Sequence, residues 1–115
     1  MIYEILFWKG EQMKYKILRT EKAEQQLRDI IFYIADDSKS IDIALNYLDK
    51  IEHAITQLED FPNLGSIPKY ATLRKQGYKV LIVERHLVFY KVNEDKKVVV
   101  IYTIVDGRRE YKNLI

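Results

Sequence analysis

Residues 77–110 constrain the fold of this chain more than any other stretch. They contain three apolar runs rich in Val, Ile, Tyr and Phe, at residues 77–84, 86–92 and 98–105. Short charged breaks, at residues 84–85 and 93–97, separate the runs. Runs of this composition with breaks of this length are typical of strands joined in antiparallel hairpins. The stretch therefore predicts a three-stranded antiparallel meander, with basic residues at the strand ends.

Two helices are predicted ahead of this meander. Residues 14–20 alternate as a first strand does, and Thr20 is followed by acidic residues, which is a helix-start signal. Apolar residues then recur at helical spacing as far as the acidic segment at residues 36–38. Ser40 begins a second stripe of the same kind. That helix ends by Phe61, because the residue before a proline avoids helical backbone angles.

The short connection between the two helices predicts an antiparallel helical hairpin. Each helix has one apolar face, and the sheet offers the surface that those faces need. We therefore expect an α+β fold: a strand, a two-helix hairpin and a three-stranded antiparallel meander, with the helices packed on one face of the sheet. Residues 61–76 hold both prolines and are expected to form a long loop. Because the strands are apolar on both faces, we expect the C-terminal tail or a partner to cover the other face.

The first residues look separate from this domain. Residues 1–12 have no counterpart elsewhere in the chain, whereas Met13 directly precedes the first predicted strand. Lys9-Gly10-Glu11 can be encoded by AAA-GGA-GAA, which contains a bacterial ribosome-binding sequence just ahead of the Met13 codon. We therefore expect residues 1–12 to be a leader or an extra N-terminal segment, and residues 13–115 to form a single domain. The alternative for residues 2–8 is an edge strand or a partner-binding arm.

Composition and charge narrow the class of protein. The 115 residues carry a net charge of +2 and no cysteine, which excludes disulfides and cysteine-based zinc sites or nucleophiles and fits a reducing cytoplasm. Residues 1–60 have a net charge of −4 and residues 61–115 a net charge of +6, so the sheet half is basic. A basic half suits phosphate backbones or an acidic protein partner. No run is long enough to span a membrane, and the separated histidines predict no metal or cofactor.

Four segments, in this order, resemble the RelE/ParE superfamily of bacterial toxins from toxin–antitoxin modules. They are FPNLG after the helical hairpin, GYKVLIVE and HLVFYKV in the next two strands, and VVVIYTIVDGRREY at the last strand. The resemblance covers residues 13–115. It implies a type II toxin that arrests growth and is held inactive by a cognate antitoxin, in a toxin–antitoxin hetero-oligomer. It also implies a target, either ribosome-bound mRNA that is cleaved, as by RelE-like toxins, or DNA gyrase that is inhibited, as by ParE-like toxins.

The resemblance to RelE-like nucleases implies a partial catalytic set. Lys79 matches a basic residue of their second strand, Arg109 matches the arginine after the last strand, and Tyr111 stands near their C-terminal tyrosine at a shorter spacing. Two further basic positions are replaced by Leu81 and Leu87, and Arg85 lies two residues before the second of these. The candidate catalytic residues are Lys79, Arg85, Arg109 and Tyr111.

The remaining basic residues of the C-terminal half are candidates for contact with nucleic acid or with the protein target. They are Arg74, Lys75, Lys91, Arg108 and Lys112. A plain solvated basic surface is the competing interpretation, and His53, His86, Tyr90 and Tyr102 are expected to be packing or surface residues. A non-toxic or degenerate nucleic-acid-binding module of the same fold stays open as an alternative. The scatter of tyrosines over both strand faces argues against a base-stacking RNA platform.

Overall fold

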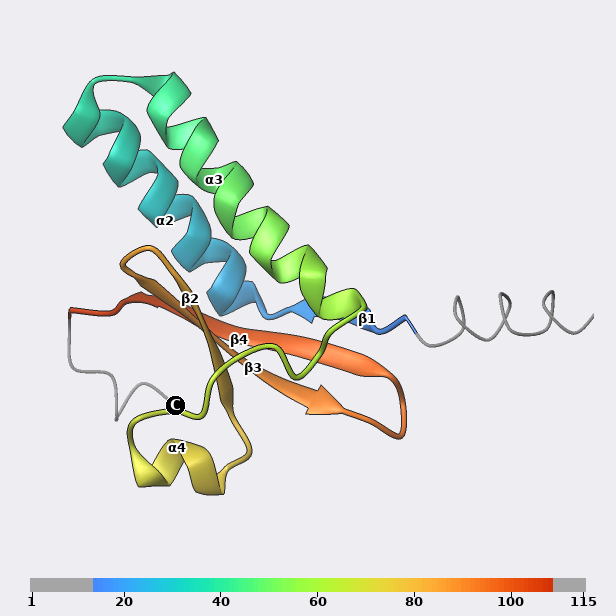
Figure 1. The fold of residues 1–115 in the computed structure, drawn as a ribbon. Coiled ribbons are helices and arrows are strands. Elements are labelled where there is room, and N and C mark those ends of the chain that lie inside the picture. The colour runs from blue at the N-terminus through green and yellow to red at the C-terminus, as the bar shows by residue number, and fades with distance from the viewer. Residues whose placement is uncertain (1–13, 109–115) are drawn as a thin grey trace, which may run out of the picture.

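The computed structural model describes residues 14–108, so the predicted leader at residues 1–12 lies outside the described residues. The chain forms a four-stranded sheet with a helical hairpin on one face, as Figure 1 shows. The elements in order are β1 (Lys16–Arg19), α2 (Glu21–Ser38), α3 (Ile41–Thr56), the 3₁₀ turn η1 (Gln57–Glu59), α4 (Ala71–Lys75), β2 (Lys79–Val83), β3 (His86–Asn93) and β4 (Val98–Asp106). None of the helices within residues 14–108 has the length and apolar character that a membrane crossing requires.

The sheet has the strand order β1-β4-β3-β2. β2, β3 and β4 pair antiparallel as the predicted meander, and β1 pairs parallel with β4 at one edge. The α+β fold expected from the sequence, with its strand, helical hairpin and meander, is therefore confirmed. The pairing of β3 with β4 places His86 opposite Asp106, which brings the start of one strand beside the end of the next.

Both long helices begin where the sequence predicts. The hydroxyl of Thr20 accepts a hydrogen bond from the Ala23 amide at 3.0 Å, and that of Ser40 accepts one from the Ile43 amide at 3.2 Å. Each cap pairs an amide that has no partner within its helix. Lys39 ends α2 in the left-handed region, with φ of 59°. This residue reverses the chain in the short connection that makes the hairpin.

The main core lies between the hairpin and the sheet. Leu27, Ile51, Ile55 and Leu58 come from the helical side, and each is at most 5% exposed. They pack against the apolar strand residues Leu81, Val88, Tyr90, Val99 and Ile101. The sheet thus covers the apolar face of α3 at Ile51 and Ile55, whereas Ile41 and Leu45, near the start of that helix and on its predicted apolar stripe, are 70% and 48% exposed.

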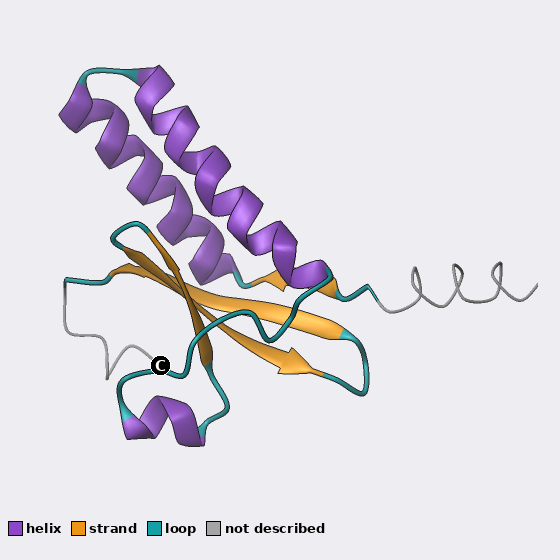
Figure 2. Cartoon of the chain, in the orientation of Figure 1, coloured by secondary structure: helices purple, strands orange, loops and turns teal. Residues whose placement is uncertain are grey.

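Part of the other face of the sheet is covered by α4. Leu73 of α4 packs with Tyr78, Val80 and Phe89 in a second buried cluster, on the side away from the hairpin (Figure 2). The assignment of all of residues 61–76 to a loop was therefore wrong. Ile82, which shares this face with Val80, is 65% exposed, so cover of the rest of the face by the tail or by a partner stays a prediction. α4 has only five residues, too few for a helical periodicity to stand out between turn residues.

The loop before α4 is fastened to the sheet at Gly65. The Gly65 amide donates to the Tyr90 hydroxyl at 2.9 Å, and Ser66 exchanges two backbone hydrogen bonds with Val80, of 2.8 and 3.0 Å. The bridge to Val80 covers part of the outer edge of β2. The FPNLG segment therefore ties the end of the helical hairpin to the edge strand.

Candidate functional site

Two of the predicted basic residues meet at one end of the molecule. Arg85 occupies the tight turn between β2 and β3, and Arg108 lies two residues after the end of β4. The Gly107 amide donates to the Arg85 carbonyl at 2.7 Å, which holds the two segments together. Both arginines line a groove of about 470 Å³ between α2 and the end of the sheet, which we call the arginine groove. Its other lining residues include Asp29, Ile30, Tyr33, Ile34, His86 and Asp106.

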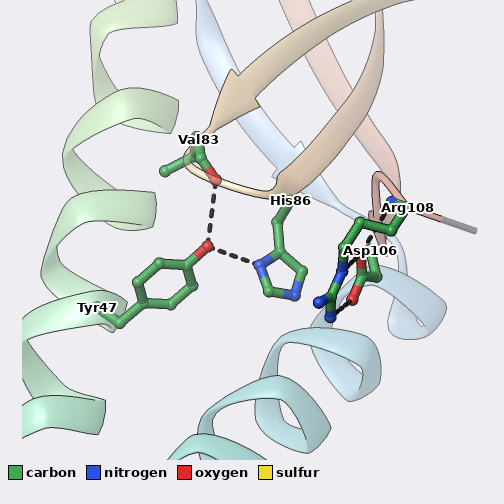
Figure 3. A network of polar contacts seen from close by, with 5 residues as sticks. All are labelled: Tyr47, Val83, His86, Asp106 and Arg108. Atoms are coloured by element: carbon green, nitrogen blue, oxygen red, sulfur yellow. Dashed lines mark hydrogen bonds and ion pairs between the residues drawn. The ribbon is translucent and has the colours of Figure 1, made fainter.

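His86 is buried at the inner wall of this groove. It is 4% exposed, and its Nδ1 lies 2.6 Å from the hydroxyl of Tyr47, which comes from the middle of α3 (Figure 3). The same hydroxyl donates to the Val83 carbonyl at 3.1 Å. Because a tyrosine has only one hydroxyl proton, His86 Nδ1 must be the donor to Tyr47, and Nε2 then carries no proton. Burial lowers the pKa of His86 and raises that of Tyr47, so both are neutral near pH 7.

Asp106 and Arg108 form a chelated pair beside His86 (Figure 3). The Asp106 carboxylate accepts from the Arg108 backbone amide at 2.9 Å, from Nε at 3.0 Å and from Nη2 at 2.7 Å. These hydrogen bonds hold the pKa of Asp106 well below its usual range. The pair fixes the guanidinium of Arg108 at the rim of the groove. The negative charge of Asp106 also offsets much of the positive charge of this guanidinium.

The other predicted residues lie elsewhere on the sheet. Lys79 begins β2 and, by strand alternation, shares the hairpin-covered face with Leu81. Lys91 lies on the opposite face, where its Nζ is 4.5 Å from the centre of the Tyr78 ring and 5.4 Å from that of Tyr102. These are cation–π distances, so Lys91 has a packing role in the structure.

α4 carries two more of the predicted contact residues. Arg74 donates to the carbonyls of Pro68 at 3.0 Å and Lys69 at 2.7 Å, so its side chain stabilises the loop that precedes α4. Lys75 is exposed in the last turn of α4, away from the arginine groove. Arg109, Tyr111 and Lys112 lie outside the described residues.

Sequence reasoning missed the role of Tyr47 and assigned His86 only to packing or the surface. Tyr47 lies three residues after Ala44 and four before Ile51, so it belongs to the apolar stripe of α3. A polar tip on such a stripe is a signal for a buried hydrogen-bond partner. That partner, His86, lies 39 positions further along the chain.

The arginine groove combines apolar and charged side chains. Within residues 14–108, no group of His, Asp and Glu is placed to hold a metal ion. Arg85 and Arg108 share one groove, whereas Lys79 and Lys91 occupy opposite faces of the sheet. An apolar groove with charged residues at its rim can take up an apolar peptide segment and orient it.

Comparison with known proteins adds an independent observation. A family model described as the ParE toxin of the type II toxin–antitoxin system parDE matches residues 17–111. Among solved structures, the chain is similar to a chromosomal ParDE system from P. aeruginosa, with a TM-score of 0.67 and 18% identity over 82% of this chain and 97% of that chain. It is also similar to the toxin–antitoxin complex RelBE2 from Mycobacterium tuberculosis, with a TM-score of 0.56 and 16% identity over 81% of this chain and 98% of that chain. No curated protein sequence matches it.

Proposed function

This chain belongs to the ParE toxin family of type II toxin–antitoxin systems, and from this premise we propose that it arrests growth by binding and inhibiting DNA gyrase without cleaving nucleic acid. The observation that carries the proposal is the separation of the basic side chains. Lys79 and Arg85 belong to opposite ends of the β2 segment, and a five-residue strand spans about 13 Å. Lys91 lies on the opposite face from Lys79 and is engaged with two tyrosine rings.

RNA cleavage needs several groups around one phosphate. One group removes the proton of a 2′-hydroxyl, others stabilise the charge of the transition state, and one protonates the leaving oxygen. Leu81, which replaces a basic residue of RelE-like nucleases, is 7% exposed and belongs to the main core. Leu87 is also apolar, and it packs against the second core cluster. The described residues thus support an inhibitor that binds through the arginine groove.

The test compares two activities of the purified protein. We expect it to inhibit supercoiling by gyrase and to leave ribosome-bound mRNA intact. Arg85→Ala should weaken the inhibition about tenfold, because it removes an exposed charge at the rim of the groove. Lys96→Ala is the matched control, since it removes one exposed positive charge in the turn between β3 and β4, and it should leave the inhibition unchanged.

Two results would contradict this proposal. Cleavage of ribosome-bound mRNA with normal supercoiling would favour a nuclease instead. One observation supports that second candidate: neutral His86 shares the arginine groove with Arg85 and Arg108, and it could accept a proton there. Normal growth after induction of the gene would favour a non-toxic module of the same fold.

We also propose that a cognate antitoxin neutralises the protein by placing a segment in the arginine groove. The groove offers apolar contact through Ile30 and Ile34, and Tyr33 is 61% exposed beside them. Both of the similar solved structures are of toxin–antitoxin systems. An amphipathic segment in this groove would bury the apolar residues and mask both arginines.

Hydrogen exchange with the antitoxin present measures this contact. We expect slower amide exchange in residues 26–34 of α2 and in the turn between β2 and β3 after the antitoxin is added. The turn at residues 93–97, at the other end of the sheet, serves as the internal reference and should not change. Unchanged exchange along the groove in a stable complex would contradict the proposed site.

A further inference from the structure

The side-chain amide of Gln26, in α2, is held in one orientation by β4. Its Oε1 accepts hydrogen bonds from the Thr103 hydroxyl and from the Ile104 backbone amide, both at 2.8 Å. A backbone N–H can only donate, so the oxygen of this amide faces Ile104 and its Nε2 points away from that bond. Thr103 and Ile104 are 1% and 2% exposed, so both partners of Oε1 are fixed in the interior.

The start of α2 is bound to the same strand. The pairing of β3 with β4 skips Tyr102, which makes a bulge there. Beside this bulge the Thr20 hydroxyl donates to the Tyr102 carbonyl at 2.9 Å, and the Thr20 amide donates to the Ile101 carbonyl at 3.0 Å. These bonds hold α2 against β4 from its N-cap onward, so the direction of the Gln26 amide is set before any partner binds.

The free end of this amide opens into the arginine groove, which Gln26 lines. Nε2 has no hydrogen-bond partner among residues 14–108. Within those residues, no fully buried side-chain nitrogen or oxygen lacks a partner. Nε2 is therefore accessible, and it offers the groove two N–H donors that the fold itself does not use.

The charges of the groove favour an acidic partner. Both of its carboxylates already accept hydrogen bonds, Asp106 from Arg108 and Asp29 from Gln25 at 2.9 Å. Arg85, by contrast, forms no ion pair within the described part of the chain. A free guanidinium attracts a carboxylate and repels a basic segment.

The two free donors lie at different places along the groove. Ile104, which holds Gln26, is opposite Val88, and Val88 is three residues after Arg85. Three residues of strand span about 10 Å. Near Gln26 the groove is lined by Ile30 and Ile104, where a carboxylate without a counter-charge is costly to bury. A neutral carbonyl oxygen is the acceptor that suits Gln26, whereas a carboxylate suits Arg85.

We propose that Gln26 is a recognition residue of the arginine groove, and that its Nε2 donates to a backbone carbonyl of an extended acidic segment of the antitoxin. This role rests on the proposed function, in which an antitoxin segment enters the groove. A carboxylate about three residues along the extended segment then reaches Arg85. Successive carbonyls of an extended chain point to opposite sides, so a shift by one residue turns the carbonyl away from Nε2. Gln26 thereby sets the register of the segment.

Gln26→Glu tests the donor with the least change in shape. The new carboxylate still accepts from Thr103 and Ile104, so the thermal unfolding temperature should not fall. It also places an oxygen where the free N–H bonds were, and this oxygen repels the carbonyl of the segment. We expect the affinity for the purified cognate antitoxin, measured by titration calorimetry with both full-length proteins, to fall at least about tenfold. Gln57→Glu, which adds the same charge at an exposed residue after α3, is the matched control and should leave the affinity unchanged.

Nuclear magnetic resonance of isotope-labelled protein reports the contact directly. The side-chain NH₂ signals of Gln26 are identified through their connection to its backbone. Addition of the antitoxin should shift these signals and slow their hydrogen exchange, which a purely structural role of Gln26 would not produce. Unshifted signals in the complex would overturn the proposal, even if Gln26→Glu fails to fold.

The Arg85→Ala variant separates this role from the proposed function. If Arg85→Ala weakens antitoxin binding and a folded Gln26→Glu does not, the segment occupies the groove without contacting Gln26, and the recognition role is wrong. If neither variant weakens binding, the groove is not the antitoxin site, and both proposals are wrong. An equal loss of affinity in Gln57→Glu would show a general effect of charge and would also overturn the role of Gln26.

Discussion

Replacing Ile51 with alanine lowers the free energy of unfolding by about 2–5 kcal/mol, the range for deleting a large aliphatic side chain from a core. Ile51 is 0% exposed and lies on the face of α3 that packs against the sheet. The loss combines the transfer of the deleted methyl groups with the cavity that they leave. Since a domain of this size is stable by about 5–15 kcal/mol, this one change removes a large share of the total.

The same substitution on the exposed side of α3 provides the control. Ile41 is 70% exposed, so Ile41→Ala should change stability by no more than about 0.5 kcal/mol. Urea unfolding of both variants, followed by circular dichroism, measures the difference. Equal destabilisation by the two substitutions would mean that α3 does not bury Ile51 against the sheet.

The long elements were predictable because local signals specify them. Thr20 and Ser40 cap helices in the structure as the sequence indicated, and the apolar stripes define which helical faces meet the sheet. The meander followed from three apolar runs with short charged breaks. Periodicity and capping act over a few residues, and a single sequence contains all that is needed to recognise them.

The candidate site was less predictable because it depends on contacts between distant segments. Arg85 and Arg108 meet only because β3 pairs with β4 in the register that places His86 opposite Asp106. Strand alternation could have separated Lys79 from Lys91, but only after the pairing of β2 with β3 was known. Tyr47 contacts His86 because the helical hairpin crosses this end of the sheet. No local sequence pattern predicts that crossing.

Gly65 is another residue whose role depends on contacts with distant segments. Replacing it is expected to have a large effect on stability. A glycine next to a turn usually suggests a left-handed backbone, yet Gly77 is the glycine with positive φ among the described residues. Gly65 is instead a site of close approach. A Cβ there would lie 2.6 Å from the Tyr90 hydroxyl and 2.8 Å from the Val80 carbonyl oxygen. Both neighbours are fixed, since Tyr90 is 0% exposed and Val80 belongs to β2.

We therefore expect Gly65→Ala to lower the free energy of unfolding by about 1–3 kcal/mol, the usual cost of overpacking. A double-mutant cycle with Tyr90→Phe identifies the cause. Removing the Tyr90 hydroxyl relieves the shortest contact, so the alanine should destabilise the Tyr90→Phe protein less than it destabilises the wild type. A residual cost should remain, because the Val80 carbonyl still opposes the new methyl group. Equal costs in both backgrounds would show that the loop does not press on Tyr90, and the fastening of the FPNLG segment to the sheet would have to be reconsidered.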